Sequence, residues 1–139
     1  MKRKITLILV VVMMLVCSMN VSLYAASGDY EVYRWDNIVS VLDVISFDGT
    51  AGNYSAMISG ASGVDKITAT VTLYYKSPNN GKWLEMPRDW TYSVDDDRLI
   101  IDEDFTALSG REYKVELKAT VYKDGYGEPV SKTSTKTCP

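Results

Sequence analysis

One stretch near the end of this 139-residue chain alternates strictly between apolar and polar side chains. Its apolar members are Tyr113, Val115, Leu117, Ala119 and Val121, and Glu112, Lys114, Glu116, Lys118 and Thr120 stand between them. Successive side chains of a strand point to opposite faces of a sheet, so this period of two predicts a strand with one buried and one solvated face. A chain built from such strands must bury one face of each against a second layer.

The same period recurs from residue 38 onward. Six further segments are predicted as strands: 38–47, 53–59, 67–76, 90–94, 98–105 and 130–137. Positions 38, 41, 42 and 45 would also fit one face of a helix, but the density of β-branched residues there favours a strand. Leu99 and Ile101 are predicted to point inward, while the face of Ile100 is ambiguous. The Ser/Thr content of the last segment is typical of an edge strand.

Turn-forming residues separate these segments. Gly, Asn or Asp occur in each of the stretches 48–52, 59–63, 77–81, 95–97 and 123–127. These residues tolerate positive φ or hydrogen-bond their own backbone, and Asn80-Gly81 is a strong hairpin signal. About seven short strands without a convincing helix predict an all-β fold, an antiparallel β-sandwich over residues 37–137.

Residues 108–115, Leu-Ser-Gly-Arg-Glu-Tyr-Lys-Val, resemble the entry to the sixth strand of fibronectin type III and related immunoglobulin-like sandwiches. The resemblance implies that the hydroxyl of Tyr113 reaches back to the backbone as a tyrosine corner, and that Trp83 is a core tryptophan. Tyr54, Tyr75 and Tyr113 are also predicted to be core residues.

The chain as a whole is similar to a group of small exported proteins of Gram-positive bacteria. Three motifs carry this similarity: Gly-Val-x-Lys-Ile-x-Ala-x-x-x-Leu at 63–73, Asn-Gly-Lys-Trp at 80–83 and Gly-x-x-Tyr-x-Val at 110–115. The group has no assigned activity, so the resemblance implies a fold and a location and leaves the function open.

The N-terminus has the order of a secretory signal. It carries three basic residues, an apolar run and then two small residues: Lys2, Arg3 and Lys4, then 5–16, then Ala25 and Ala26. This order predicts a signal peptide over 1–25, an N-terminal extension over 26–36 and a secreted, extracellular protein. The alternatives are an uncleaved anchor, for which the run is short, and lipid attachment at Cys17, which the preceding Val16 disfavours.

The net charge and the cysteine content limit the kinds of partner that we expect for this protein. Removal of the three basic signal residues leaves 12 basic against 18 acidic residues, a net charge of −6. An acidic domain repels nucleic acid and anionic membranes, so we expect neither as a partner after signal cleavage. The remaining Cys138, next to the C-terminus, is predicted to lie on a frayed tail, as an incidental residue or as a crosslinking thiol.

The sequence offers little for catalysis or cofactor binding. It contains no histidine, which excludes Ser-His-Asp and Cys-His nucleophilic sites and the commonest zinc ligand. No phosphate-binding or dinucleotide motif occurs, and no cofactor or enzyme activity is predicted. Asp95, Asp97, Asp102 and Asp104 are weak calcium candidates, if a hairpin brings alternate carboxylates together; a solvated turn is the plainer interpretation.

Aromatic residues provide the other binding hypothesis. The chain has ten tyrosines and three tryptophans. By alternation, Tyr74 and Tyr122 point outward from strands predicted to be central, and exposed aromatic rings can stack on sugars or seat partner side chains. Cross-strand packing on the solvent face is the competing explanation. Carbohydrate or a surface protein is therefore the expected kind of partner.

These observations predict a secreted, non-catalytic module for binding or adhesion at the cell surface or outside the cell. The alternative is a structural or effector protein that self-assembles or crosslinks through edge strands or Cys138. The fold alone does not decide between them.

Overall fold

The computed structural model describes residues 35–88 and 90–139, and within them every regular element is a strand. The strands are β1 (Ile38–Asp48), β2 (Ala51–Gly60), β3 (Lys66–Lys76), β4 (Trp83–Glu85), β5 (Trp90–Val94), β6 (Arg98–Thr106), β7 (Glu112–Lys123) and β8 (Tyr126–Thr137). The signal peptide expected over 1–25, Cys17 and most of the extension expected over 26–36 lie outside the described residues. None of the described residues belongs to a helix that could cross a bilayer.

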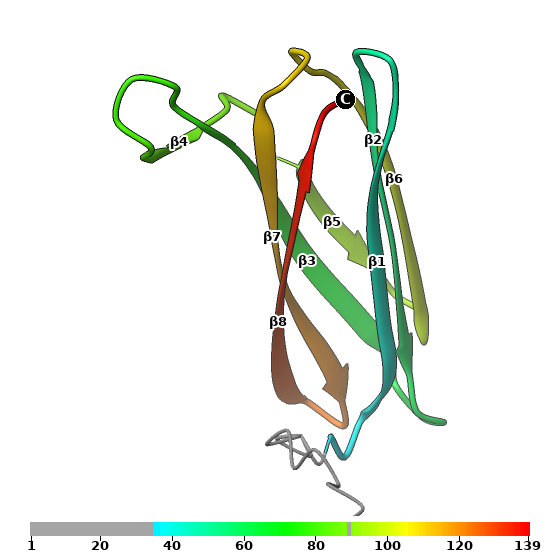
Figure 1. Ribbon diagram of the computed structural model, residues 1–139. Helices are drawn as coiled ribbons and strands as arrows, with labels where there is room; N and C mark the ends of the chain where they lie inside the picture. The colour runs from blue at the N-terminus through cyan, green and yellow to red at the C-terminus, as the bar shows by residue number, and fades with distance from the viewer. Residues whose placement is uncertain (1–34, 89) are drawn as a thin grey trace, which may run out of the picture. The chain divides into compact units, whose positions relative to one another are not determined.

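Two antiparallel sheets face each other (Figure 1). The first, sheet A, has the order β1-β2-β6. The second, sheet B, has the order β4-β3-β7-β8. β5 pairs with the same edge of β3 as β4 does, but nearer the start of β3. The all-β antiparallel sandwich predicted from the sequence is thus confirmed. The seven predicted segments correspond to β1, β2, β3, β5, β6, β7 and β8. The eighth strand, β4, is three residues long and was not predicted.

The predicted strands match the observed ones closely. The segment with a competing helical pattern is β1, and the Ser/Thr-rich last segment is an edge strand, β8. The hairpin at Asn80-Gly81 joins β3 to β4, with Gly81 at φ 68°. Asp124 and Gly125 form the two-residue turn between β7 and β8, with φ values of 52° and 77°. Both turns need positive φ, which these residue types tolerate.

The inward faces of the two sheets form one hydrophobic core. Leu99 and Ile101 point into it as predicted, as do Tyr54 and Tyr113. The fully buried side chains include Ile58, Ile67, Val71, Leu73, Val115, Leu117 and Val121. This core is the alternating apolar face that the sequence showed, so burial of that face drives the two sheets together.

An aromatic cluster fills one end of the core. Phe47, Gly52 and Phe105 lie in one row across sheet A, and the two phenyl rings meet edge to face over the glycine, with centroids 5.9 Å apart. Tyr113 of sheet B contacts both rings, at 5.8 Å from Phe47 and 5.5 Å from Phe105. A Cβ on Gly52 would lie 2.5 Å from the Phe105 ring, so this row needs a residue without a side chain.

The hydroxyl of Tyr113 closes a corner of the chain. Tyr113 is the second residue of β7 and is buried, and its hydroxyl accepts a hydrogen bond of 2.8 Å from the backbone N–H of Leu108. The bond spans the turn between β6 and β7 and therefore fixes how the chain passes from sheet A to sheet B. The reach-back that the fibronectin type III resemblance implied for Tyr113 is present.

Polar bridges close the two open edges of the sandwich. Where β1 meets β8, the carboxylate of Asp43 faces inward, with a side-chain exposure of 2%, pairs with Lys132 Nζ at 3.1 Å and accepts a hydrogen bond from Ser134. Where β5 meets β6, the Tyr92 hydroxyl donates to Glu103 at 2.5 Å. Each bridge links one sheet to the other, so both edges are held by charged hydrogen bonds, which are stronger than neutral ones.

Two residues do not lie where the sequence predicted. Trp83 is half-buried on β4 and lies outside the core: its ring lies below Lys76 Nζ at 5.6 Å and Lys114 Nζ at 5.3 Å. The prediction of a core tryptophan was wrong because β4 is a short edge strand that leaves the sandwich with the β3–β4 hairpin (Figure 1). Trp90 of β5 packs against the core instead.

Cys138 is the second correction. Its side chain is fully buried, and its thiol donates to the Gly49 carbonyl at 3.3 Å. Backbone hydrogen bonds of 2.9 Å join Cys138 N–H to the Arg111 carbonyl and Gly110 N–H to the Cys138 carbonyl. The predicted frayed tail is wrong because these bonds continue the pairing of β8 past its last strand residue. A disulfide to another molecule would require the C-terminus to detach.

Candidate functional site: the outer face of sheet A

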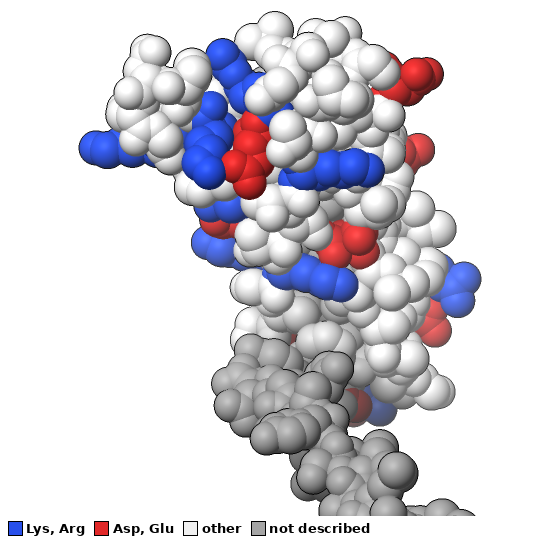
Figure 2. All heavy atoms as spheres, in the orientation of Figure 1, with Lys and Arg blue, Asp and Glu red and all other residues white. Residues whose placement is uncertain are grey.

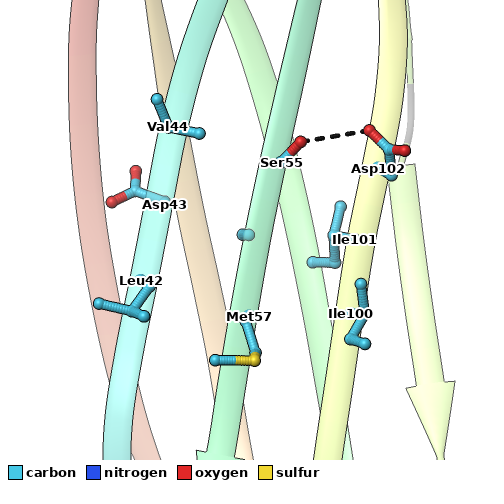
Figure 3. A pocket seen from close by; sticks show the side chains of 9 residues that line it. Leu42, Asp43, Val44, Ser55, Met57, Ile100, Ile101 and Asp102 are labelled. Carbon is cyan, nitrogen blue, oxygen red and sulfur yellow. Dashed lines mark hydrogen bonds between the residues drawn. The ribbon is translucent and has the colours of Figure 1, made fainter.

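The outer face of sheet A carries a continuous apolar strip. Leu42 of β1 pairs with Met57 of β2, which pairs with Ile100 of β6, so three apolar side chains form one row across the sheet (Figure 3). Val44 extends the row by one position along β1. The exposed fractions are 68% for Ile100, 57% for Leu42 and 53% for Val44, and a shallow depression runs among these side chains. We call Leu42, Val44, Met57 and Ile100 the apolar strip.

Charged residues border the strip on both sides along β6. Asp102 and Asp104 follow Ile100 on the same face, and Arg98 precedes it. Ser55 Oγ donates to Asp102 at 3.2 Å, and Asn53 Nδ2 donates to Asp102 at 2.7 Å and to Asp104 at 3.0 Å. The carboxylates are thus held in place by neighbouring β2, and the apolar strip lies between an acidic and a basic end.

The strip offers an exposed apolar surface of the kind that binds partners. Exposed apolar patches of this kind, rimmed by polar residues, mark interaction surfaces in soluble proteins. The carboxylates, hydroxyl and amide beside it are hydrogen-bonded to each other. The chemistry that this face offers is burial of apolar area with charge pairing at its rim.

The four calcium candidates do not converge. Asp95 and Asp97 lie in the turn between β5 and β6, whereas Asp102 and Asp104 lie along β6 beside β2. β5 pairs with β3 in sheet B, so β5 and β6 do not form the hairpin that would bring the carboxylates together. In the described part of the chain, no group of three or more metal-ligating side chains is close enough to hold a metal ion. Asp102 and Asp104 are instead bridged by Asn53.

Tyr74 lies on the outer face of sheet B within a charged cluster. The Nζ of Lys114 sits over its ring, 4.3 Å from the centroid, and its hydroxyl donates to Glu116 at 3.4 Å. Burial, and then the charge of Glu116, raises the pKa of Tyr74. A hydrogen bond from Lys114, at 2.6 Å, lowers the pKa of Glu116. In Figure 2, Lys and Arg side chains gather most densely over this hairpin end of sheet B, with Asp and Glu between them.

Tyr122 lies at the opposite end of the same face. Tyr74 pairs with Lys114, whereas Tyr122 pairs with Lys66 and with Gly127. Tyr122 lies eight positions after Lys114 on β7, about 27 Å along a strand. The two tyrosines therefore do not form one platform, and each is half-buried against cross-strand neighbours. A ligand-binding role for either one stays a prediction.

The sequence contained a signal for the apolar strip that the alternation argument passed over. β1 is apolar on both faces, with Val41 and Ile45 buried and Leu42 and Val44 exposed. That density on both faces made the segment fit a helical pattern as well as a strand, and Ile100 was ambiguous for the same reason. A strand that is apolar on both faces is typical of a strand covered on both sides.

Comparison with known proteins adds nothing on activity. No protein-family model matches the sequence, and no curated protein matches it. Among solved structures, the chain is similar to a β-glucuronidase from Parabacteroides merdae, with 12% identity and a TM-score of 0.41 over 71% of this chain and 13% of that one. It is also similar to a protein from Archaeoglobus fulgidus, with 12% identity and a TM-score of 0.36 over 72% of this chain and 96% of that one.

Proposed function

We propose that this chain is an exported, non-catalytic binding module that contacts a protein surface through the apolar strip. One observation carries the proposal: the exposed Leu42 and Ile100 flank the half-buried Met57 in one apolar row across three neighbouring strands, on the outside of a sheet that already buries its other face. Exposed single apolar residues need no explanation, but a contiguous row with a charged rim does. Covering the row with a partner removes its apolar area from water.

Export and the immunoglobulin-like class belong to the same proposal. The basic, apolar and small segments at the N-terminus support export, as does the similarity to small exported proteins of Gram-positive bacteria. The hydrogen bond from Leu108 to Tyr113 and the sandwich of antiparallel sheets support an immunoglobulin-like or fibronectin type III-like domain. Domains of that kind present sheet faces and loops on a rigid frame for binding.

A protein partner fits the strip better than a carbohydrate does. Sugar recognition relies on aromatic platforms, and the strip is aliphatic, with a methionine at its centre. The aromatic face, at Tyr74 and Trp83, lies on the other sheet and is already covered by the side chains of Lys76 and Lys114. Crosslinking through Cys138, an alternative open from the sequence, is disfavoured by the full burial of its thiol.

Site-specific photocrosslinking tests the proposed surface. A photoreactive aromatic residue replaces Ile100 in the full chain, produced in cells that secrete it, and a matched chain carries it at the exposed Thr133 on the outer face of sheet B. We expect irradiation to give one defined adduct from position 100 and none from position 133. Leu42→Asp in the same chain, which places a charge in the row, should abolish the adduct. The absence of an adduct at position 100, or equal adducts at both positions, would contradict the proposal.

A further inference from the structure

We infer that the partner seated on the apolar strip is a second copy of this chain, packed sheet A against sheet A about a twofold axis. This inference rests on the proposed function, because it names the occupant of the same surface. Its basis is the order of side chains along the outer face of β6, where Arg98, Ile100 and Asp102 follow one another. The basic Arg98 and the acidic Asp102 thus lie at equal distances on either side of the row, which passes through Ile100.

A twofold axis along the Leu42–Met57–Ile100 row makes this order complementary to itself. Rotation about that axis keeps each strand opposite its own copy but reverses its direction, so each residue of the row faces the same residue of the second copy. Arg98, two residues before Ile100, then faces Asp102 of the second copy, which lies two residues after it, and the reverse pair forms on the other side. Self-complementary patches of this kind are the requirement for a twofold interface.

The two side chains can span the gap between the sheets. Sheets that pack face to face lie about 10 Å apart, a distance that an Arg and an Asp side chain cover together. The Arg98 guanidinium forms no ion pair or hydrogen bond with another described residue, so it is available. Asp102 already accepts bonds from Ser55 and Asn53, and a carboxylate has about four acceptor positions, so it can still receive the guanidinium.

The positions next to the row on β1 and β2 pair without burying an unpaired charge. Val44 faces Ser40 of the second copy, and Ser55 faces Ser59. Farther out, Asp104 comes near the acidic turn at 95–97 of the second copy, which is unfavourable. An interface that covers three strands, about 4.8 Å apart, and about five side-chain rows would bury roughly 1,000 Å² of accessible surface in total. This area is near the lower limit for a specific protein–protein interface. The dimer is therefore expected to be weak and reversible.

Charge reversal tests this geometry by sedimentation velocity over a concentration series of the purified chain. We expect the unmodified chain to show a reversible monomer–dimer equilibrium. Arg98→Asp and Asp102→Arg should each weaken it at least about tenfold, because both ion pairs become like-charge pairs. An equimolar mixture of the two variants should dimerise again, because both contacts between positions 98 and 102 then join an acid to a base. Lys118→Asp, on the outer face of sheet B, is the matched control and should leave the equilibrium unchanged.

Several outcomes would overturn the inference. A monomer at every concentration, variants that dimerise like the unmodified chain, or a mixture that does not associate would each do so. The mass of the photocrosslinked adduct from position 100 distinguishes failure of the dimer from failure of the proposed binding surface. An adduct of twice the chain mass supports the dimer, and an adduct of another mass overturns the dimer but keeps the binding surface. No adduct overturns both.

Discussion

Tyr113→Phe removes one hydroxyl from the core and leaves its ring in place. The ring contacts with Phe47 and Phe105 remain, since phenylalanine has the same shape apart from the hydroxyl. What is lost is the hydrogen bond that the hydroxyl accepts from Leu108 N–H at the turn between β6 and β7. The variant therefore measures the contribution of the corner bond to the stability of the sandwich.

The structure sets the expected size of the loss. Removing one partner of a hydrogen bond and leaving the other unsatisfied costs about 1–3 kcal/mol. Leu108 is 53% exposed and the bond itself is only partly buried, so we expect the lower part of that range, about 1–2 kcal/mol. For a domain of roughly 100 residues, this lowers the melting temperature by roughly 5–10 °C.

Urea denaturation followed by circular dichroism measures the change, and Tyr122→Phe is the matched control. Tyr122 lies on the same strand, half-buried, and its hydroxyl makes no hydrogen bond with another described residue. The control should change the free energy of unfolding by less than about 0.5 kcal/mol. If the two variants lose the same stability, or if Tyr113→Phe loses less than about 0.5 kcal/mol, the corner bond does not stabilise the fold as argued.

Three further predictions follow from the core and from one edge of the sandwich. Gly52→Ala should lower stability by about 1–3 kcal/mol in urea denaturation, because its Cβ would lie 2.5 Å from the Phe105 ring; an unchanged midpoint would contradict this. In a Cys17→Ser chain, the Cys138 thiol should react with a thiol reagent far more slowly when native than in denaturant, and equal rates would show that it is exposed. Burial, then the hydrogen bond to Glu103, raises the pKa of Tyr92 above its ordinary value of 10.0, so its contribution to stability should be complete below pH 10 and decline at higher pH. Urea midpoints from pH 8 to pH 11 should therefore fall less steeply for Tyr92→Phe than for the unmodified chain.

Alternation in the sequence was sufficient to predict every strand except the three-residue β4, together with the inward faces. Each strand has one face that must be buried, and a register slip by one residue would move every apolar side chain to the wrong face. The inward positions of Leu99 and Ile101 therefore followed from the sequence alone. The turns were equally predictable, because positive φ at Gly81 and Gly125 restricts the residue types that fit.

Residues whose environment depends on distant parts of the chain were not predictable in this way. The burial of Cys138 depends on pairing with Arg111 and contact with Gly49, which lies 89 residues away in the sequence. The inward-facing Asp43 likewise has its partners, Lys132 and Ser134, on the last strand. Neither contact has a local pattern, because each forms only once the two sheets have packed.

The apolar strip is a different case, because its residues were visible in the sequence but alternation predicts only the buried half of each pattern. Alternation assigns one face of a strand to the core and treats the other as solvated, so apolar residues at outward positions count as noise. In β1 these outward residues are informative. The apolar surface of Leu42 and Val44 continues across the sheet through Met57 to Ile100, and only the pairing register shows that these residues are neighbours. An outward apolar residue becomes evidence for a partner when the adjacent strands place others beside it. By that criterion sheet A has two faces that favour burial, and the fold itself covers one of them.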